Sequence, residues 1–172
     1  DADANTDDST CTYPDNGEYV LEFNGDGDYI VIEDSESLMP LSPFTVSFLT
    51  SLHSHNNYNQ FINNADWSDA SRNDFILSAN SNEVYVYIDG AMYSSNILPS
   101  LNQWIAITLT FDPEIDDLKL YFDGEEVAQW TVENELQYPQ PPINIGGYSN
   151  FPDDLSYNTV DGLMDNIVIW NR

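Results

Sequence analysis

The stretch QWIAITLTFDPEIDDLKLYFDGEEV, residues 103–127, decides the fold of this chain. Apolar residues alternate with small or polar ones in two successive runs, and a period of two is typical of strands with one buried face. Asp123-Gly124 follows the second run, and Asp89-Gly90 gives the same tight-hairpin signal upstream. We therefore predict antiparallel strands with a core that includes Ile105, Ile107, Leu109, Leu118, Leu120, Phe122, Ile167 and Ile169.

The rest of the chain divides into short segments rich in β-branched and aromatic residues, separated by Gly, Asn, Asp and Pro. No long run has the period of 3.6 that a helix requires. The pattern predicts an all-β, two-sheet antiparallel sandwich. The clearest strands are expected at residues 19–23, 29–33, 44–50, 75–79, 83–89, 104–111, 118–122, 126–131 and 163–170.

Length and charge narrow the possible functions. The 172 residues fit one domain, which we place at residues 18–172 after an Asp-rich linker, or the end of a preceding repeat, at residues 1–17. The net charge of −27 disfavours nucleic acid and anionic membranes as partners. Such charge is typical of a saline exterior, where ions screen it, although solubility alone is an equal explanation.

Two further features of the composition concern order and location. Hydrophobic residues make up 41% of the chain, so its acidity does not indicate disorder. No apolar run reaches the roughly 18 residues needed to span a bilayer, and no leader opens the chain, so we expect no membrane insertion and an export signal that was removed or lies upstream. Cys11 is interpreted as half of a disulfide whose partner lies outside this sequence, or else as a free exposed thiol.

Six segments occur in an order that resembles the laminin-G-like family of jelly rolls, which are related to concanavalin A and the pentraxins. The resemblance covers residues 18–172, and one departure from it is Leu49, where the family usually has tryptophan. It implies a concanavalin A-like jelly roll. The segments are LEFNGDGDYIVIEDSESL (21–38), FTVSF (44–48), QWIAITLTFD (103–112), LKLYFDGEEV (118–127), INIGG (143–147) and DGLMDNIVIWNR (161–172).

The opening DADANTDDSTCTYP resembles the end of a short, cysteine-paired, Asp-rich repeat from large surface proteins of marine Bacteroidetes. This resemblance implies that the chain is a module of a longer secreted protein and that it works outside the cell or at the cell surface. It also implies that Cys11 pairs with an upstream cysteine.

Catalytic motifs are missing from the sequence. Hydrolases of this fold carry ExDxxE on one strand, and the nearest run here, Glu114 to Lys119, ends in lysine and is predicted to be a solvated turn. There is no GxSxG motif for nucleophilic catalysis. His53 and His55 would form a zinc or copper site on one strand, but their polar neighbours favour a solvent loop. We predict no enzymatic activity.

Calcium is a candidate ligand because the chain is rich in carboxylates and loops. Asn24 to Asp28 begins like an EF-hand loop but lacks the glycine and the glutamate that complete one. By analogy with related jelly rolls, which often hold calcium at a sheet edge, the candidate ligands are Asp26, Asp28 and Asp165. Turn formation and backbone capping explain the same aspartates equally well.

Glycan binding requires flat aromatic surfaces and planar polar side chains, on a sheet face or a loop edge. One long polar stretch between predicted strands supplies both, and stretches of that length are usually functional or disordered. Its candidate residues are Tyr58, Asn59, Gln60, Asn63, Asn64, Trp67 and Arg72. Alternation places Tyr85, Tyr87 and Tyr121 outward as a further stripe, although tyrosine also simply favours half-exposed strands.

These features predict a non-catalytic carbohydrate-binding or adhesion module of a larger secreted protein, with a polysaccharide or cell-surface glycan as its partner. A structural spacer in a giant surface protein is the alternative. An isolated glycoside hydrolase-like domain is the third possibility, which the missing ExDxxE disfavours.

Overall fold

A computed structural model describes residues 19–33, 43–55, 58–64, 75–88, 90–133, 142–147 and 159–171. Within these ranges there is no helix with the length and hydropathy needed to cross a bilayer. The strands in chain order are β1 (Leu21–Asn24), β2 (Ile30–Ile32), β3 (Phe44–Leu52), β4 (Asn59–Asn63), β5 (Phe75–Ala79), β6 (Val84–Ile88), β7 (Ala91–Ser94), β8 (Ile105–Asp112), β9 (Asp117–Phe122), β10 (Glu125–Thr131), β11 (Ile143–Ile145) and β12 (Asp161–Asn171).

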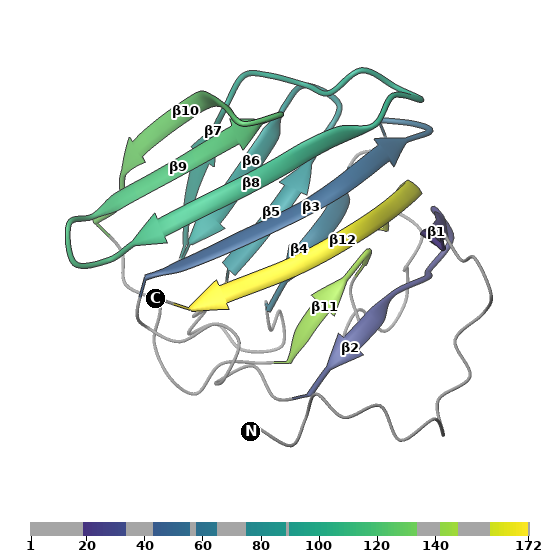
Figure 1. The fold of residues 1–172 in the computed structure, drawn as a ribbon, viewed down its shortest axis with the longest axis horizontal. Coiled ribbons are helices and arrows are strands. Elements are labelled where there is room, and N and C mark those ends of the chain that lie inside the picture. The colour runs from purple at the N-terminus through teal and green to yellow at the C-terminus, as the bar shows by residue number, and fades with distance from the viewer. Residues whose placement is uncertain are drawn as a thin grey trace, which may run out of the picture.

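The strands form two six-stranded antiparallel sheets that lie one over the other (Figure 1). Sheet A has the order β1-β12-β3-β8-β9-β10, and sheet B has the order β2-β11-β4-β5-β6-β7. Neighbours in a sheet are often distant in sequence, as with β3 between β12 and β8. These sheets confirm the predicted all-β jelly-roll sandwich.

The hydrophobic core fills the space between the sheets. Phe44 of β3 contacts Phe75 of β5 edge to face, with ring centroids 5.5 Å apart. Phe48 of β3 lies 5.1 Å from Phe61 of β4. Since β3 belongs to sheet A and its partners to sheet B, these aromatic pairs join the two layers.

The predicted core residues separate into two groups. Ile107, Leu109, Leu118, Leu120 and Phe122 are buried, as the period of two predicts. Ile105, Ile167 and Ile169 are partly buried and pack against the core from its margin.

Both predicted hairpins are present. Asp123 and Gly124 have φ values of 50° and 84° between the paired residues Phe122 and Glu125, as a type I′ turn requires. Gly90, with φ of 88°, lies in the loop that joins β6 to β7.

Three strands lie outside the predicted set. Residues 59–63 form β4, a wholly buried strand, where the sequence predicted part of a long polar loop. β7 follows the Gly90 hairpin, and β11 lies within the INIGG segment. Leu49 pairs with Ala106 and Asp165 and lies on the outward side of sheet A. The presence of leucine where the family usually has tryptophan therefore does not thin the core.

Candidate functional site

The outward face of sheet B carries two rows of side chains that run across the strands. In the first row Gln60 of β4 pairs with Ser78 of β5, Ser78 pairs with Tyr85 of β6, and Tyr85 pairs with Ser94 of β7. Directly paired residues of an antiparallel sheet point to the same side. The first row is therefore a continuous polar strip.

The second row runs beside the first and is polar at one end and apolar at the other. Asn144 of β11 pairs with Asn63 of β4, and Asn63 pairs with Ile76 of β5. Ile76 pairs with Tyr87 of β6, which pairs with Met92 of β7. Two amides thus continue into an apolar and aromatic flank.

Alternation along the strands shows that both rows face away from sheet A. Phe75 and Leu77 of β5 belong to the hydrophobic core, as do Val86 and Ile88 of β6. The residues between them must point to the other side of the sheet. Several of these are nevertheless shielded from solvent, since Ser78 is 0% exposed and Tyr85 is 7% exposed.

Asn63 and Asn144 are joined in an amide network. Asn63 Nδ2 donates to the Gly147 carbonyl at 2.7 Å, and Asn144 Nδ2 donates to Asn63 Oδ1 at 3.3 Å and to the Pro142 carbonyl at 3.4 Å. Asn144 Oδ1 is buried and has no hydrogen-bond partner. Gln60 Oε1 in the first row is buried and unpartnered in the same way.

Two tyrosines, Tyr58 and Tyr85, lie on the same side of sheet B as Gln60. Burial raises the pKa of the Tyr85 hydroxyl, with smaller upward effects from Tyr58 and Glu83 and an opposing hydrogen bond with Ser78. Tyr58, which is 46% exposed, directly precedes β4 and stands two residues before Gln60, so alternation places it on the same side of the sheet. The seven residues Tyr58, Gln60, Asn63, Ser78, Tyr85, Tyr87 and Asn144 are called the outer-face site below.

Five of the predicted ligand residues thus meet on one face, namely Tyr58, Gln60, Asn63, Tyr85 and Tyr87. Two others have structural roles. Asn59 pairs with the core residue Ala79. Its side-chain oxygen accepts the Asp161 N–H at 3.1 Å, and its side-chain nitrogen donates to the Ser54 carbonyl at 3.3 Å. Asn64 accepts the Phe75 N–H at 2.7 Å, which ties β4 to β5.

Tyr121 was predicted to extend the stripe of Tyr85 and Tyr87, and that prediction is wrong. Tyr121 lies on β9 in sheet A, whereas β6 lies in sheet B. Outward residues of the two layers face opposite ways, so these rings cannot contact one ligand surface. Alternation identified the outward residues correctly but could not show which sheet each strand would join.

Ser78 and Asn144 belong to the site but were not predicted. The alternation of Phe75, Leu77 and Ala79 with Ile76 and Ser78 contained the signal for Ser78. Asn144 lies between two isoleucines in a three-residue strand, which is too short for a reliable period. Trp67, Arg72, Cys11 and residues 1–17 lie outside the described residues.

The three predicted calcium ligands do not converge. Asp26 and Asp28 follow β1, in a turn where Asn24 N donates to Asp28 Oδ2 at 3.3 Å and Gly25 N donates to Val160 O at 2.9 Å. Asn24 pairs with Asp161, and Asp165 lies four residues further along β12, which is roughly 14 Å from this pair at about 3.4 Å per residue. The described residues contain no cluster of three candidate metal-ligating side chains.

The histidines and the first half of the acidic run lie in turns, as the sequence predicted, whereas the second half of the run, Asp117 to Lys119, belongs to β9 and not to the predicted turn. His53 and His55 follow the end of β3, and they contact Asp161 at 3.7 Å and the Pro99 carbonyl at 2.9 Å respectively. Glu114 and Asp116 are exposed in the turn between β8 and β9. Lys119, within β9, forms an ion pair with Asp117 at 3.1 Å.

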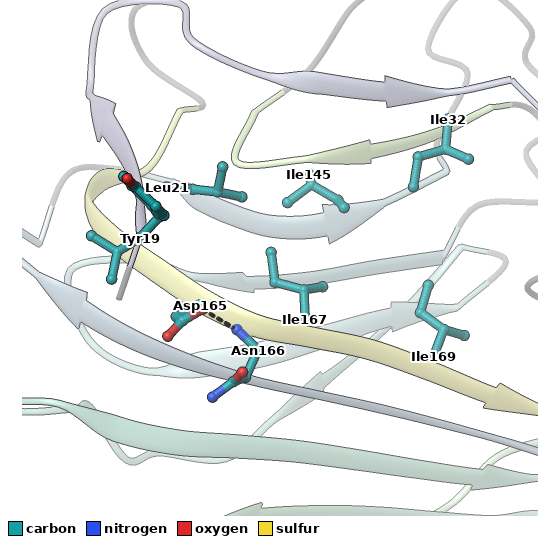
Figure 2. A pocket seen from close by; sticks show the side chains of 9 residues that line it. Tyr19, Leu21, Ile32, Ile145, Asp165, Asn166, Ile167 and Ile169 are labelled. Carbon is teal, nitrogen blue, oxygen red and sulfur yellow. Dashed lines mark hydrogen bonds between the residues drawn. The ribbon is translucent and has the colours of Figure 1, made fainter. Parts of the chain in front are cut away.

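A pocket of about 430 Å³ opens at the margin of the sandwich (Figure 2). Ile32 and Ile145 of sheet B face Ile167 and Ile169 of sheet A across it. The carboxylate of Asp165 at its rim already accepts the Asn166 N–H at 2.7 Å. Aliphatic walls offer few partners for sugar hydroxyls, so the pocket fits a glycan less well than the outer-face site does.

A laminin G family model, described as the concanavalin A-like lectin/glucanases superfamily, matches residues 24–172. The chain belongs to this superfamily. The match covers every strand of both sheets except the first three residues of β1. Among curated protein sequences, the comparison finds no match to the chain.

Solved structures similar to this superfamily member share its fold at low sequence identity. A CBM40 of Ruminococcus gnavus sialidase bound to α2,3 sialyllactose has a TM-score of 0.70 and 14% identity, with 89% of this chain and 90% of that chain covered. NanB sialidase of Streptococcus pneumoniae has a TM-score of 0.70 and 18% identity, with 89% and 25% covered. Mouse laminin α1 domains LG4-5 have a TM-score of 0.68 and 13% identity, with 92% and 44% covered.

The superfamily member thus spans a quarter of the sialidase chain and under half of the laminin chain. Against the sialyllactose-bound module the coverage is nearly complete for both partners. A fold of this size is therefore found both as a separate module and as part of larger proteins.

Proposed function

We propose that this chain is a carbohydrate-binding module and that its ligand binds the outer-face site. The observation that carries the proposal is the presence of amides, hydroxyls and tyrosine rings on one sheet face, with two buried amide oxygens that lack a donor. Amides hydrogen-bond sugar hydroxyls, and aromatic rings pack on the apolar faces of sugars. The similarity to a module bound to sialyllactose supports this class of ligand.

The module is proposed to bind without catalysis. Glycosidases generally use a pair of carboxyl groups that flank the scissile bond. Glu83 is the carboxylate that raises the pKa of Tyr85 electrostatically. It already accepts hydrogen bonds from Ser94 Oγ at 2.9 Å and from Asn96 N at 2.8 Å. Its fixed orientation supports a structural role at the edge of the site.

The proposed setting is extracellular, within a larger surface protein that adheres to a polysaccharide or to the glycans of another cell. The acidic composition supports a saline exterior, and the coverage of larger relatives is in keeping with a modular role. We propose that calcium is bound by Asp26 and Asp28 of the turn after β1, without Asp165, which is too distant to share the ion.

Substitution of Tyr58 tests the binding proposal. Tyr58→Ala removes an exposed ring from the site, so glycan affinity should fall at least about tenfold, as expected for an aromatic anchor. The melting temperature should change little, because Tyr58 is 46% exposed. Glycan-array hits measured again by calorimetry would give both the ligand and the size of the loss.

Trp104→Ala is the matched control. Trp104 is 47% exposed and directly precedes β8 of sheet A, so its loss should leave binding unchanged. Equal losses in both variants would contradict the placement of the site. Silence of the intact protein on every glycan, with and without EDTA, would favour the spacer alternative instead.

Trp67 remains a predicted sugar-stacking residue, with Arg72 as its polar neighbour. Trp67→Ala should abolish binding without loss of stability if the ligand extends from the sheet face to this segment. Retained binding in Trp67→Ala together with loss in Tyr58→Ala would confine the site to the sheet.

A further inference from the structure

The two unpartnered oxygens of the outer-face site bear on which glycans it accepts. Among the described residues, three buried side-chain atoms lack a hydrogen-bond partner, and Gln60 Oε1 and Asn144 Oδ1 are two of them. Folded proteins satisfy nearly all buried polar groups, so each exception calls for an explanation. Here both exceptions lie on the same sheet face, in adjacent rows.

The amide network fixes the chemical character of the Asn144 oxygen. Backbone carbonyls only accept hydrogen bonds, so the side-chain nitrogens of Asn63 and Asn144 must point toward Gly147 and Pro142. Asn144 Nδ2 also donates to Asn63 Oδ1, which leaves Asn144 Oδ1 with unused lone pairs. This atom is therefore a hydrogen-bond acceptor, and only a group that donates a hydrogen bond can satisfy it.

The charge of the protein also disfavours an anionic ligand at this site. The chain contains three cationic residues, and the one within the described ranges, Lys119, lies in sheet A and is paired with Asp117. Tyr85 is a neutral donor at neutral pH, because the usual pKa of tyrosine is about 10 and burial raises the pKa of Tyr85 further. Beyond the site the net charge of −27 opposes any anionic ligand.

We infer that the outer-face site accepts neutral glycans, whose hydroxyl groups donate to Gln60 Oε1 and Asn144 Oδ1, and rejects glycans with carboxylate or sulfate groups. This inference rests on the proposed carbohydrate-binding function and specifies its ligand. An ionised acid only accepts hydrogen bonds, so it would place its oxygens against the unpartnered amide oxygens, and no Lys or Arg among the described residues lies on this face to offset them.

Matched pairs of glycans test the inference. Neutral oligosaccharides would be compared with the same chains carrying sialic acid, uronic acid or sulfate, at low salt and at about 0.5 M sodium chloride, where long-range charge is screened. We expect neutral forms to bind at least about tenfold more tightly, and the preference to persist at high salt because it arises from local contacts.

The possible outcomes separate the two proposals. An acidic glycan that binds as tightly as its neutral partner would overturn the inference while leaving carbohydrate binding intact. If the preference for neutral glycans disappears at high salt, it arises from the net charge of the protein, and the proposed role of the amide oxygens is overturned. Absence of binding to every glycan would remove the proposed function and the inference with it.

Substitutions of Gln60 test the acceptor directly. Gln60→Leu removes the unpartnered oxygen, so the melting temperature should hold or rise while neutral-glycan affinity falls at least about tenfold. Ser54→Ala is the matched control, since Ser54 Oγ is the third unpartnered buried atom and lies outside the outer-face site. It should share the effect on stability and leave binding unchanged.

Gln60→Glu keeps acceptor oxygens at this position but buries a carboxyl group, so its melting temperature should fall while the folded variant still binds neutral glycans. Loss of binding in both Gln60 variants, measured well below their melting temperatures, would assign the contact to the side-chain nitrogen and overturn the inference. Retained binding in Gln60→Leu would show that the oxygen contacts no ligand and would overturn it as well.

Discussion

Leu109 and Thr108 are adjacent in β8, yet their environments differ completely. Leu109 is 0% exposed between Val46 and Leu120, whereas Thr108 is partly exposed and its hydroxyl lies 2.8 Å from that of Ser47. Leu109→Ala should therefore cost about 2–5 kcal/mol of stability by opening a cavity. Thr108→Ala should cost about 1 kcal/mol, the net value of one hydrogen bond. Urea unfolding measures both, and the reverse order would show that the register is wrong.

Tyr85 links the stability of the protein to alkaline pH. Burial raises its pKa in the folded state above the usual value of about 10. The resulting contribution is complete below the unfolded pKa and is lost as pH rises through the folded pKa, because the unfolded chain releases the proton first. Tyr85→Phe should therefore unfold with a weaker pH dependence above about pH 10. Urea midpoints from pH 8 to pH 11 test this, and parallel curves for the two proteins would contradict it.

Gly146 directly follows β11 and lies at a crowded position. Its φ is 78°, and a Cβ built there would collide with the ring of Phe23. Its backbone also accepts the Val160 N–H at 2.8 Å and donates to Phe61 O at 3.0 Å. Gly146→Ala should cost about 1–3 kcal/mol or more from overpacking and backbone strain.

Gly124→Ala is the control for Gly146, because Gly124 also has positive φ but has nothing within 4 Å of its Cβ position. Thermal unfolding should show a smaller loss for Gly124→Ala, which retains only the strain. Similar losses in both variants would mean that the contact with Phe23 relaxes at little cost.

β4 shows why the pattern of a single element was insufficient. Its sequence NQFIN lacks a clean period of two, because the register with β5 shifts between Gln60 and Ile62 and places Phe61 and Ile62 both in the core. The hairpins at Gly90 and Asp123-Gly124 were predictable because the turn chemistry is local. A bulge depends on the partner strand and leaves no such local signal.

The net charge of −27 acts on the molecule as a whole. Monovalent salt should raise the melting temperature by screening the repulsion between carboxylates. Calcium at micromolar to millimolar levels should raise it further in a sodium chloride background, if the turn of Asp26 and Asp28 binds the ion in the native state. Asp28→Asn should reduce the calcium shift and leave the sodium shift in place. Identical calcium and sodium curves would remove the calcium proposal.

The sequence by itself determined the fold class, the hairpins, most core residues and five members of the candidate site. These depend on local alternation, turn chemistry and composition, which each strand carries with it. Only the tertiary structure decided that Tyr121 lies on the opposite sheet from Tyr85, that Asp165 is distant from Asp28, and that Asn144 joins Asn63. The physical reason is that strand order places residues distant in sequence side by side, and the period of two in each strand is the same whichever neighbour it pairs with.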